Sequence, residues 1–216
     1  MRSVVAILAA SAILVACAPH VDGGKQMPLD DPIPAGSVVG FYGDSLTFGL
    51  GASAPGKRWS TLLCERRGWT EVNPSVSGLG FVQARAGVDL PQQLVDAQPD
   101  LVVVALGHND LLLVDQRGPE VQAAITDDFR RLRAGLPDAR IVVLALFSPL
   151  TFEPPEVRTV DSWLAQSAEE VDAVFLPKSG GWLVGHPNWT VDGIHFNDAG
   201  NAAIADLLDD ELSRVL

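Results

Sequence analysis

The chain has 216 residues, 47% of them hydrophobic and 19% charged, which is typical of one folded domain with a substantial core rather than of a disordered protein. Fifteen basic residues stand against 27 acidic ones, and the formal net charge is −12. Such a charge repels phosphate backbones and anionic lipids, so it argues against general nucleic-acid binding and against simple electrostatic docking on membranes.

Residues 1–16 are typical of a bacterial export signal. Arg2 provides a positive start, and the apolar run over residues 4–15 is too short to span a bilayer. The tetrad Leu14-Val15-Ala16-Cys17 resembles the lipobox of lipoproteins, in which cleavage leaves a lipid-modified cysteine as the first residue. The alternative is an ordinary secretory signal with an incidental cysteine. We therefore expect export to the cell envelope, with membrane attachment through a lipid on Cys17, or secretion.

Residues 17–36 are rich in Pro, Gly and Asp and show no apolar period, so we interpret them as a tether. The remaining residues, 37–216, are expected to form the domain. If Cys17 is acylated, Cys64 has no partner for an intrachain disulfide. We expect Cys64 to be a small buried apolar side chain.

From residue 37 onward, short apolar runs alternate with amphipathic stretches. The runs predict strands at 38–42, 70–72, 101–106, 141–147 and 173–176, and the stretches predict helices at 58–67, 89–97, 120–134, 156–171 and 198–216. Continuous apolar runs are typical of strands that are buried on both faces. The alternation predicts an α/β fold in which helices cover both faces of a parallel sheet.

Three polar motifs follow the first three predicted strands. They are Gly43-Asp44-Ser45-Leu46, Ser77-Gly78-Leu79-Gly80 and Gly107-His108-Asn109-Asp110. In open parallel sheets, sites form at the carboxyl ends of the strands. We therefore expect the three motifs to contribute to one site.

Ser45 is the candidate nucleophile because it lies in a turn just after a strand, where its hydroxyl can project over the edge of the sheet. His195, near the start of the last helix, is the candidate general base. Asp192 lies three residues before His195 and can fix the orientation and tautomer of the imidazole. The alternatives are a turn serine and a surface histidine without a catalytic role.

An oxyanion hole could be built from the backbone N–H groups of Ser45 and Gly78 and from the side-chain amide of Asn109. The alternatives are that Asn109 caps the next helix and that Gly78 only turns the chain. His108, beside Asn109, could contact substrate, but we interpret it as a packing residue.

This set of residues resembles the SGNH hydrolases, also called the GDSL esterase/lipase family. The four residues that name the family would be Ser45, Gly78, Asn109 and His195, and Asp192 matches the aspartate three positions before the histidine. The resemblance runs from about residue 38 to the end of the chain. It implies a three-layer α/β/α sandwich, flavodoxin-like, with a five-stranded parallel sheet.

The block over residues 192–200 is especially similar to the last block of the family, although Phe196 stands where the family often has proline. The Gly107-His108-Asn109-Asp110 motif resembles that of carbohydrate acetylesterase members, which slightly favours a sugar-linked ester. Trp182 and Trp189 could then stack on a sugar ring.

The resemblance implies a serine esterase that forms an acyl-enzyme and acts on short to medium acyl esters, on a sugar or a lipid. Two alternatives are an acyltransferase that uses the same residues and a non-catalytic envelope protein that binds glycans or lipids. The complete residue set argues against the latter. The sequence lacks a phosphate-binding loop, a His-Glu-x-x-His motif and a paired cysteine cluster, so we expect neither cofactor nor metal. Separately, we expect a monomer.

Overall fold

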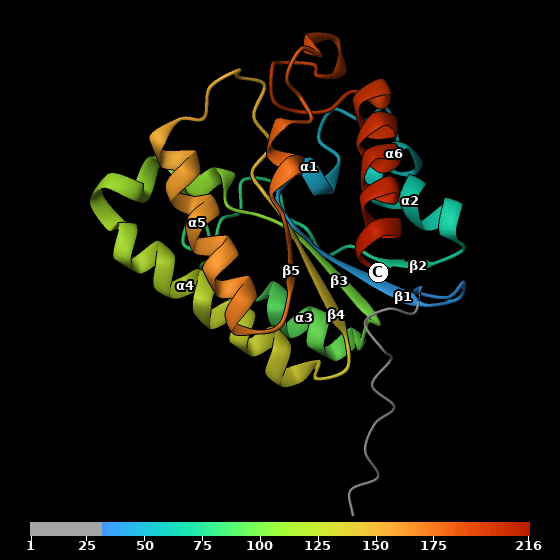
Figure 1. Ribbon diagram of the computed structural model, residues 1–216, viewed down its shortest axis with the longest axis horizontal. Helices are drawn as coiled ribbons and strands as arrows, with labels where there is room; N and C mark the ends of the chain where they lie inside the picture. Colours follow the sequence, from blue (N-terminus) through green and yellow to red (C-terminus); the bar gives the residue numbers. More distant parts are fainter. Residues whose placement is uncertain (1–31) are drawn as a thin grey trace, which may run out of the picture.

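In the computed structural model, which describes residues 32–216, five parallel strands form one sheet in the order β2-β1-β3-β4-β5 (Figure 1). The strands are β1 (Val38–Gly43), β2 (Thr70–Val72), β3 (Leu101–Ala105), β4 (Arg140–Leu144) and β5 (Val174–Leu176). Every neighbouring pair is parallel. The predicted export signal, the lipid site at Cys17 and most of the predicted tether lie outside the described residues and stay predictions.

Helices cover both faces of this sheet, as the sequence predicts. On one face lie α3 (Leu90–Ala97), α4 (Val114–Gly135) and α5 (Pro155–Glu170). On the other lie α1 (Ser45–Phe48), α2 (Trp59–Arg67) and α6 (Asp198–Val215) (Figure 1). The arrangement is a three-layer α/β/α sandwich.

The apolar strands of the centre supply two cores, because successive side chains point to opposite faces of a sheet. In β1, Phe41 joins the core under α2 and α6, while Tyr42 joins the core under α3, α4 and α5. In β3, Val103 and Val104 divide in the same way. This double burial explains why these strands are continuous apolar runs in the sequence.

Several element boundaries differ from the sequence-based ones. Helix α4 begins at Val114, six residues before the predicted start, and includes Pro119 after non-helical dihedral angles at Arg117. Strand β4 ends at Leu144, although the apolar run continues to Phe147. The run is longer than the strand because hydrophobicity follows burial, and these last residues are buried in the loop rather than paired in the sheet.

The segment just before residue 37 packs onto the domain. Ile33 is buried, and its carbonyl oxygen accepts a hydrogen bond of 3.4 Å from the indole of Trp69. Gly36 N–H donates to the carbonyl oxygen of Gly68 at 2.7 Å. The packed structure therefore begins a few residues inside the predicted tether. Cys64 is buried as expected, and burial raises the pKa of its thiol to about 12.

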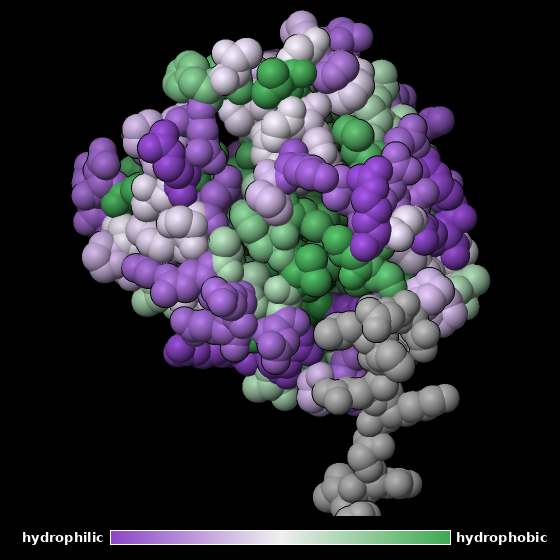
Figure 2. All heavy atoms as spheres, in the orientation of Figure 1, coloured by the Kyte–Doolittle hydropathy of each residue, from purple (hydrophilic) through white to green (hydrophobic). Residues whose placement is uncertain are grey.

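Polar side chains cover most of the outer faces of α5 and α6, while apolar side chains show at the surface between the two helices (Figure 2). Within residues 32–216, no helix has the length and apolar character needed to cross a membrane.

Candidate active site

The turn after β1 presents Ser45 at the carboxyl edge of the sheet. Asp44 caps helix α1, because its Oδ1 accepts the backbone N–H of Leu46 at 3.0 Å. The turn is so tight that a Cβ atom on Gly43 would lie 2.2 Å from Oγ1 of Thr47, and only glycine fits there. The loop before α6 lies at the same end of the sheet as α1 (Figure 1).

Three side chains predicted from the sequence form one hydrogen-bonded chain at this edge. Oγ of Ser45 lies 3.0 Å from Nε2 of His195, and Nδ1 of His195 lies 2.6 Å from Oδ2 of Asp192. A carboxylate only accepts hydrogen bonds, so Nδ1 carries the hydrogen and Nε2 presents its lone pair to the hydroxyl of Ser45. This tautomer can take a proton from the hydroxyl.

The loop that carries His195 is closed by its own backbone. Val191 N–H donates to the carbonyl oxygen of His195 at 2.8 Å. Oδ1 of Asp192 accepts the N–H groups of Ile194 and His195 at 3.0 and 2.8 Å. Hydrogen bonds from the His195 side chain and from these backbone groups lower the pKa of Asp192 to about 2. Asp192 is therefore ionised at neutral pH.

A buried asparagine, Asn201 of α6, ties this loop to the helices beside the nucleophile. Its Nδ2 donates to the carbonyl oxygen of Phe196 at 2.9 Å, and its Oδ1 accepts the N–H of Trp59 at 2.9 Å. The indole of Trp59 in turn donates to the carbonyl oxygen of Leu46 at 3.1 Å. Sequence reasoning missed Asn201, although a polar residue on the buried face of a helix was a usable signal.

The structure also brings the second and third motifs to Ser45. Nδ2 of Asn109 donates to the carbonyl oxygen of Leu79 at 2.8 Å and to Oδ2 of Asp44 at 3.3 Å. Asn109 thereby connects the loop of Gly78 to the residue before the nucleophile. Both of its amide hydrogens are engaged within the protein.

The other two proposed oxyanion donors have free N–H groups. Among the described residues, no backbone acceptor takes a hydrogen bond from the N–H of Ser45 or of Gly78. Gly78 has a positive φ of 79°, and a Cβ atom there would meet nothing within 4 Å, so the glycine faces open space. Both donors can therefore serve a negative oxygen at this edge.

Asp110 fixes the loop that carries Gly78. Its carboxylate is fully buried and accepts the N–H groups of Phe81, Val82 and Gln83 at 2.6, 3.0 and 2.9 Å. The sequence placed Asp110 in the third motif without assigning it a function. Its function could not be read there, because its partners lie 27 to 29 residues away.

The large apolar side chains that are exposed in the described part of the chain gather at this same edge. We call them the apolar rim, and each lies in a segment that follows the carboxyl end of a strand. The members are Phe48, Leu50, Val76, Leu112, Leu150, Phe152, Val191 and Ile194. Figure 2 shows apolar atoms at the upper end of the molecule, where several of these segments lie.

Trp182 and Trp189, which the sequence suggests could stack on a sugar ring, each contact an aromatic neighbour in the protein. Trp189 stacks on His186 with ring centroids 3.8 Å apart and nearly parallel planes, at 7°. Trp182 packs against Phe147 with centroids 6.0 Å apart. One face of Trp189 is therefore covered by the protein itself.

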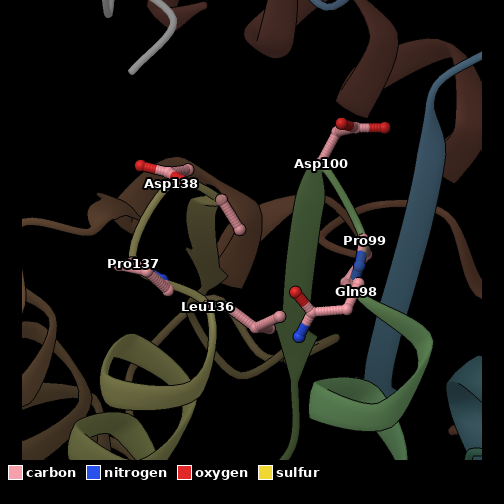
Figure 3. A pocket seen from close by; sticks show the side chains of 7 residues that line it. Gln98, Pro99, Asp100, Leu136, Pro137 and Asp138 are labelled. Atoms are coloured by element: carbon pink, nitrogen blue, oxygen red, sulfur yellow. The ribbon is translucent and has the colours of Figure 1, made fainter. Parts of the chain in front are cut away.

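A hollow of about 260 Å³ lies at the opposite edge of the sheet, near the amino ends of β3 and β4 (Figure 3). The side chains of Gln98 and Pro99 line it, with Asp100 and Asp138 at its sides. Because it opens at the amino ends of the strands, it is separate from the serine and histidine at the carboxyl ends.

Comparison with known proteins adds a family match and similar folds. The sequence matches the GDSL-like lipase/acylhydrolase family over residues 41–203. A GDSL lipase of Mycobacterium tuberculosis, Rv0518, is 28% identical over 182 residues, covering 78% of each chain.

Two solved structures have similar folds. The psychrotrophic esterase EstA of Pseudoalteromonas sp., inhibited by monoethylphosphonate, gives a TM-score of 0.65 at 22% identity, covering 82% of this chain and 97% of its own. A mutant of Axe2, a Geobacillus acetyl-xylooligosaccharide esterase, gives a TM-score of 0.64 at 19% identity. This match covers 84% of the present chain and 96% of the Axe2 chain.

Proposed function

The chain belongs to the GDSL-like lipase/acylhydrolase family and is a serine ester hydrolase of the SGNH type; we propose that it works through an acyl-enzyme on Ser45 and prefers short to medium apolar acyl groups. The observation that carries the mechanism is the continuous chain of hydrogen bonds from Asp192 through His195 to Ser45.

In the first half of the proposed reaction, Oγ of Ser45 attacks the ester carbonyl carbon while Nε2 of His195 takes the hydroxyl proton. The ionised Asp192 stabilises the imidazolium that results. The negative oxygen accepts hydrogen bonds from the N–H groups of Ser45 and Gly78 and from the amide of Asn109. When the intermediate collapses, the departing alcohol receives the proton from His195.

In the second half, water attacks the acyl carbon and gives its proton to His195. Collapse returns that proton to Ser45 and releases the carboxylic acid. A sugar or glycolipid hydroxyl in place of water would give acyl transfer from the same intermediate. The proposal needs no metal or cofactor, because side chains of the protein perform every proton transfer.

The acyl preference rests on the surroundings of Ser45. The residues of the apolar rim lie in segments that follow the carboxyl ends of the strands, and the segments 45–56, 73–84, 145–152 and 179–191 contain no Asp, Glu, Lys or Arg. An apolar acyl chain gains about 0.8 kcal/mol for each CH₂ group that it buries on such a surface. A charged or strongly hydrated acyl group would gain nothing there.

The test is hydrolysis of p-nitrophenyl acetate, butyrate, hexanoate and octanoate by the wild type and by Ser45→Ala. We expect kcat/KM of the wild type to rise from acetate toward hexanoate, and Ser45→Ala to lose at least about a thousandfold in kcat. A fluorophosphonate probe should label the wild type and leave Ser45→Ala unlabelled. Equal hydrolysis by both proteins would refute the role of Ser45. Formation of a new ester with an added alcohol would show that the acyl group is transferred to that alcohol instead of to water.

A further inference from the structure

A buried nitrogen beside the proposed site has no hydrogen-bond partner. His108 begins the 3₁₀ helix that follows β3, directly before Asn109. Its Nε2 lies 3.0 Å from the carbonyl oxygen of Phe147, which can only accept, so Nε2 carries the hydrogen. The ring of His108 packs nearly parallel to the ring of Phe147, which agrees with the interpretation of His108 as a packing residue. Its other nitrogen, Nδ1, is buried and unpaired within residues 32–216.

The group that faces Nδ1 is the carboxylate of Asp44. Oδ2 of Asp44 lies 3.8 Å from Nδ1 of His108, and the aspartate is fully buried. With no proton between them, the lone pair of Nδ1 would face a lone pair of the carboxylate, which is an unfavourable contact between two buried acceptors. Burial also raises the pKa of Asp44, which favours a proton on this pair of residues.

Oδ2 of Asp44 is also the atom that holds Asn109. Its bond to Nδ2 of Asn109 is 3.3 Å long, whereas the bond from Asn109 to the carbonyl oxygen of Leu79 is 2.8 Å. The hydrogen shared with Asp44 is therefore the more weakly held of the two. An oxyanion can recruit Asn109 only when Asp44 releases that hydrogen.

We propose that one proton is held between Nδ1 of His108 and Oδ2 of Asp44, and that this bond releases the amide of Asn109 to the oxyanion. The inference rests on the esterase mechanism proposed above. His108 is then a positioning residue, because it acts through Asp44 and Asn109 and does not touch the ester. Oδ1 of Asp44 continues to cap the helix of Ser45, so the nucleophile stays in place.

The other titratable groups on the surrounding elements have partners of their own. His195 faces Asp44 from the loop before α6 and is bound to Ser45 and Asp192. Asp110 accepts the three N–H groups of residues 81–83. Asp161 of α5 accepts the N–H of Leu146, beside Phe147. None of these contacts involves Nδ1 of His108, so comparing the wild type with His108→Asn tests the proposed pair directly.

Two substitutions that introduce an amide side chain at position 108 distinguish the function of Nδ1 from that of Nε2. In His108→Asn the side-chain amide lies near the place of Nδ1, and in His108→Gln near the place of Nε2. We expect His108→Asn to keep kcat within about threefold of the wild type and His108→Gln to lose tenfold or more, with KM unchanged, because an oxyanion donor acts in the transition state. If His108 only anchors Phe147, Gln should be the better replacement.

The pH profile of kcat provides the second measurement. In the wild type, kcat should fall at high pH, when the shared proton leaves. In His108→Asn the amide donor does not titrate, so this fall should disappear. In Asp44→Asn, the side-chain amide can donate a hydrogen bond to Nδ1 of His108. We expect this variant to be more active than Asp44→Ala, and we expect its kcat not to fall at high pH. The Asp44 variants decide the matter if His108→Gln fails to fold.

The inference is wrong if kcat of His108→Gln equals or exceeds that of His108→Asn, or if both variants keep the kcat of the wild type. It is also wrong if kcat of His108→Asn still falls at high pH. Thermal unfolding of each variant shows whether it is folded. The proposed function fails separately, if Ser45→Ala remains active or the wild type hydrolyses no ester.

Discussion

At the level of single residues, Asp192 shows how hydrogen bonds alone can lower the pKa of an exposed carboxyl group. Its side chain is 50% exposed, yet its pKa falls to about 2, because one oxygen accepts two backbone N–H groups and the other accepts from His195. The same bonds fix the direction of the carboxylate. The proposed function of Asp192 is therefore to select the tautomer of His195.

Asp192→Asn tests this function. The asparagine amide can face Nδ1 of His195 only as a donor, which shifts the imidazole hydrogen to Nε2 and removes the lone pair that Ser45 needs. We expect kcat to fall at least about a hundredfold with little change in KM. Asp198→Asn is the matched control, since Asp198 binds Ser53 and should keep kcat within about twofold. Less than a tenfold loss in Asp192→Asn would contradict the proposal.

At the level of elements, helix α5 is joined to the end of β4 by a carboxyl group that is poorly solvated. Oδ1 of Asp161 accepts the N–H of Leu146 at 2.9 Å. Burial raises the pKa of Asp161 to about 7, and the backbone hydrogen bond opposes this shift only in part. The folded protein therefore retains a proton that the unfolded chain has already released above about pH 4.

This difference makes stability depend on pH in a defined direction. Below about pH 4, Asp161 is protonated in both the folded and the unfolded state and does not reduce the free energy of unfolding. From about pH 4 to 7 the free energy of unfolding falls, and above pH 7 the full destabilisation by Asp161 is present. Asp161→Asn keeps an acceptor for Leu146 and avoids the charge. We expect it to raise the free energy of unfolding by about 2 to 4 kcal/mol at pH 8 and to have little effect at pH 4.

Urea unfolding at the two pH values measures this effect. Glu169→Gln, at an exposed position of the same helix, is the control for removing an acid. An Asp161→Asn protein that is no more stable than the wild type at pH 8 would show that Asp161 is not a strained buried acid.

At the level of the whole molecule, the fold divides its surface by function. The chain enters β1 at the amino edge, while the apolar rim and the chain of hydrogen bonds lie at the carboxyl edge.

Removing rim side chains should change acyl selectivity and leave stability intact. Leu112 is 92% exposed and Phe152 is 65% exposed, so their loss costs the fold little. We expect Leu112→Ser and Phe152→Ser to reduce kcat/KM for p-nitrophenyl octanoate about three- to tenfold and to leave the acetate unaffected, because only the longer chain reaches the rim. A uniform loss on both esters, or none on the octanoate, would contradict the assignment of the rim to acyl binding.

The sequence determined the fold class because its signals are local. Alternating apolar runs and amphipathic stretches predicted the order of strands and helices, and motifs after three strands predicted a common edge. The position of Asp192 three residues before His195 is also a local signal. The predicted boundaries were wrong at the end of β4, where burial continues beyond strand pairing, and at the start of α4, which lies six residues earlier and precedes a kink at Arg117.

Only the tertiary structure decided the contacts between loops. Ser45 and His195 are 150 residues apart, and no pattern within either segment fixes the distance between their side chains. The contact of His108 with Asp44 and the bridge made by Asn201 likewise join separate strands and helices. Hydrophobic periodicity reports which face of an element is buried, whereas a catalytic hydrogen bond depends on how several packed elements place two side chains within about 3 Å.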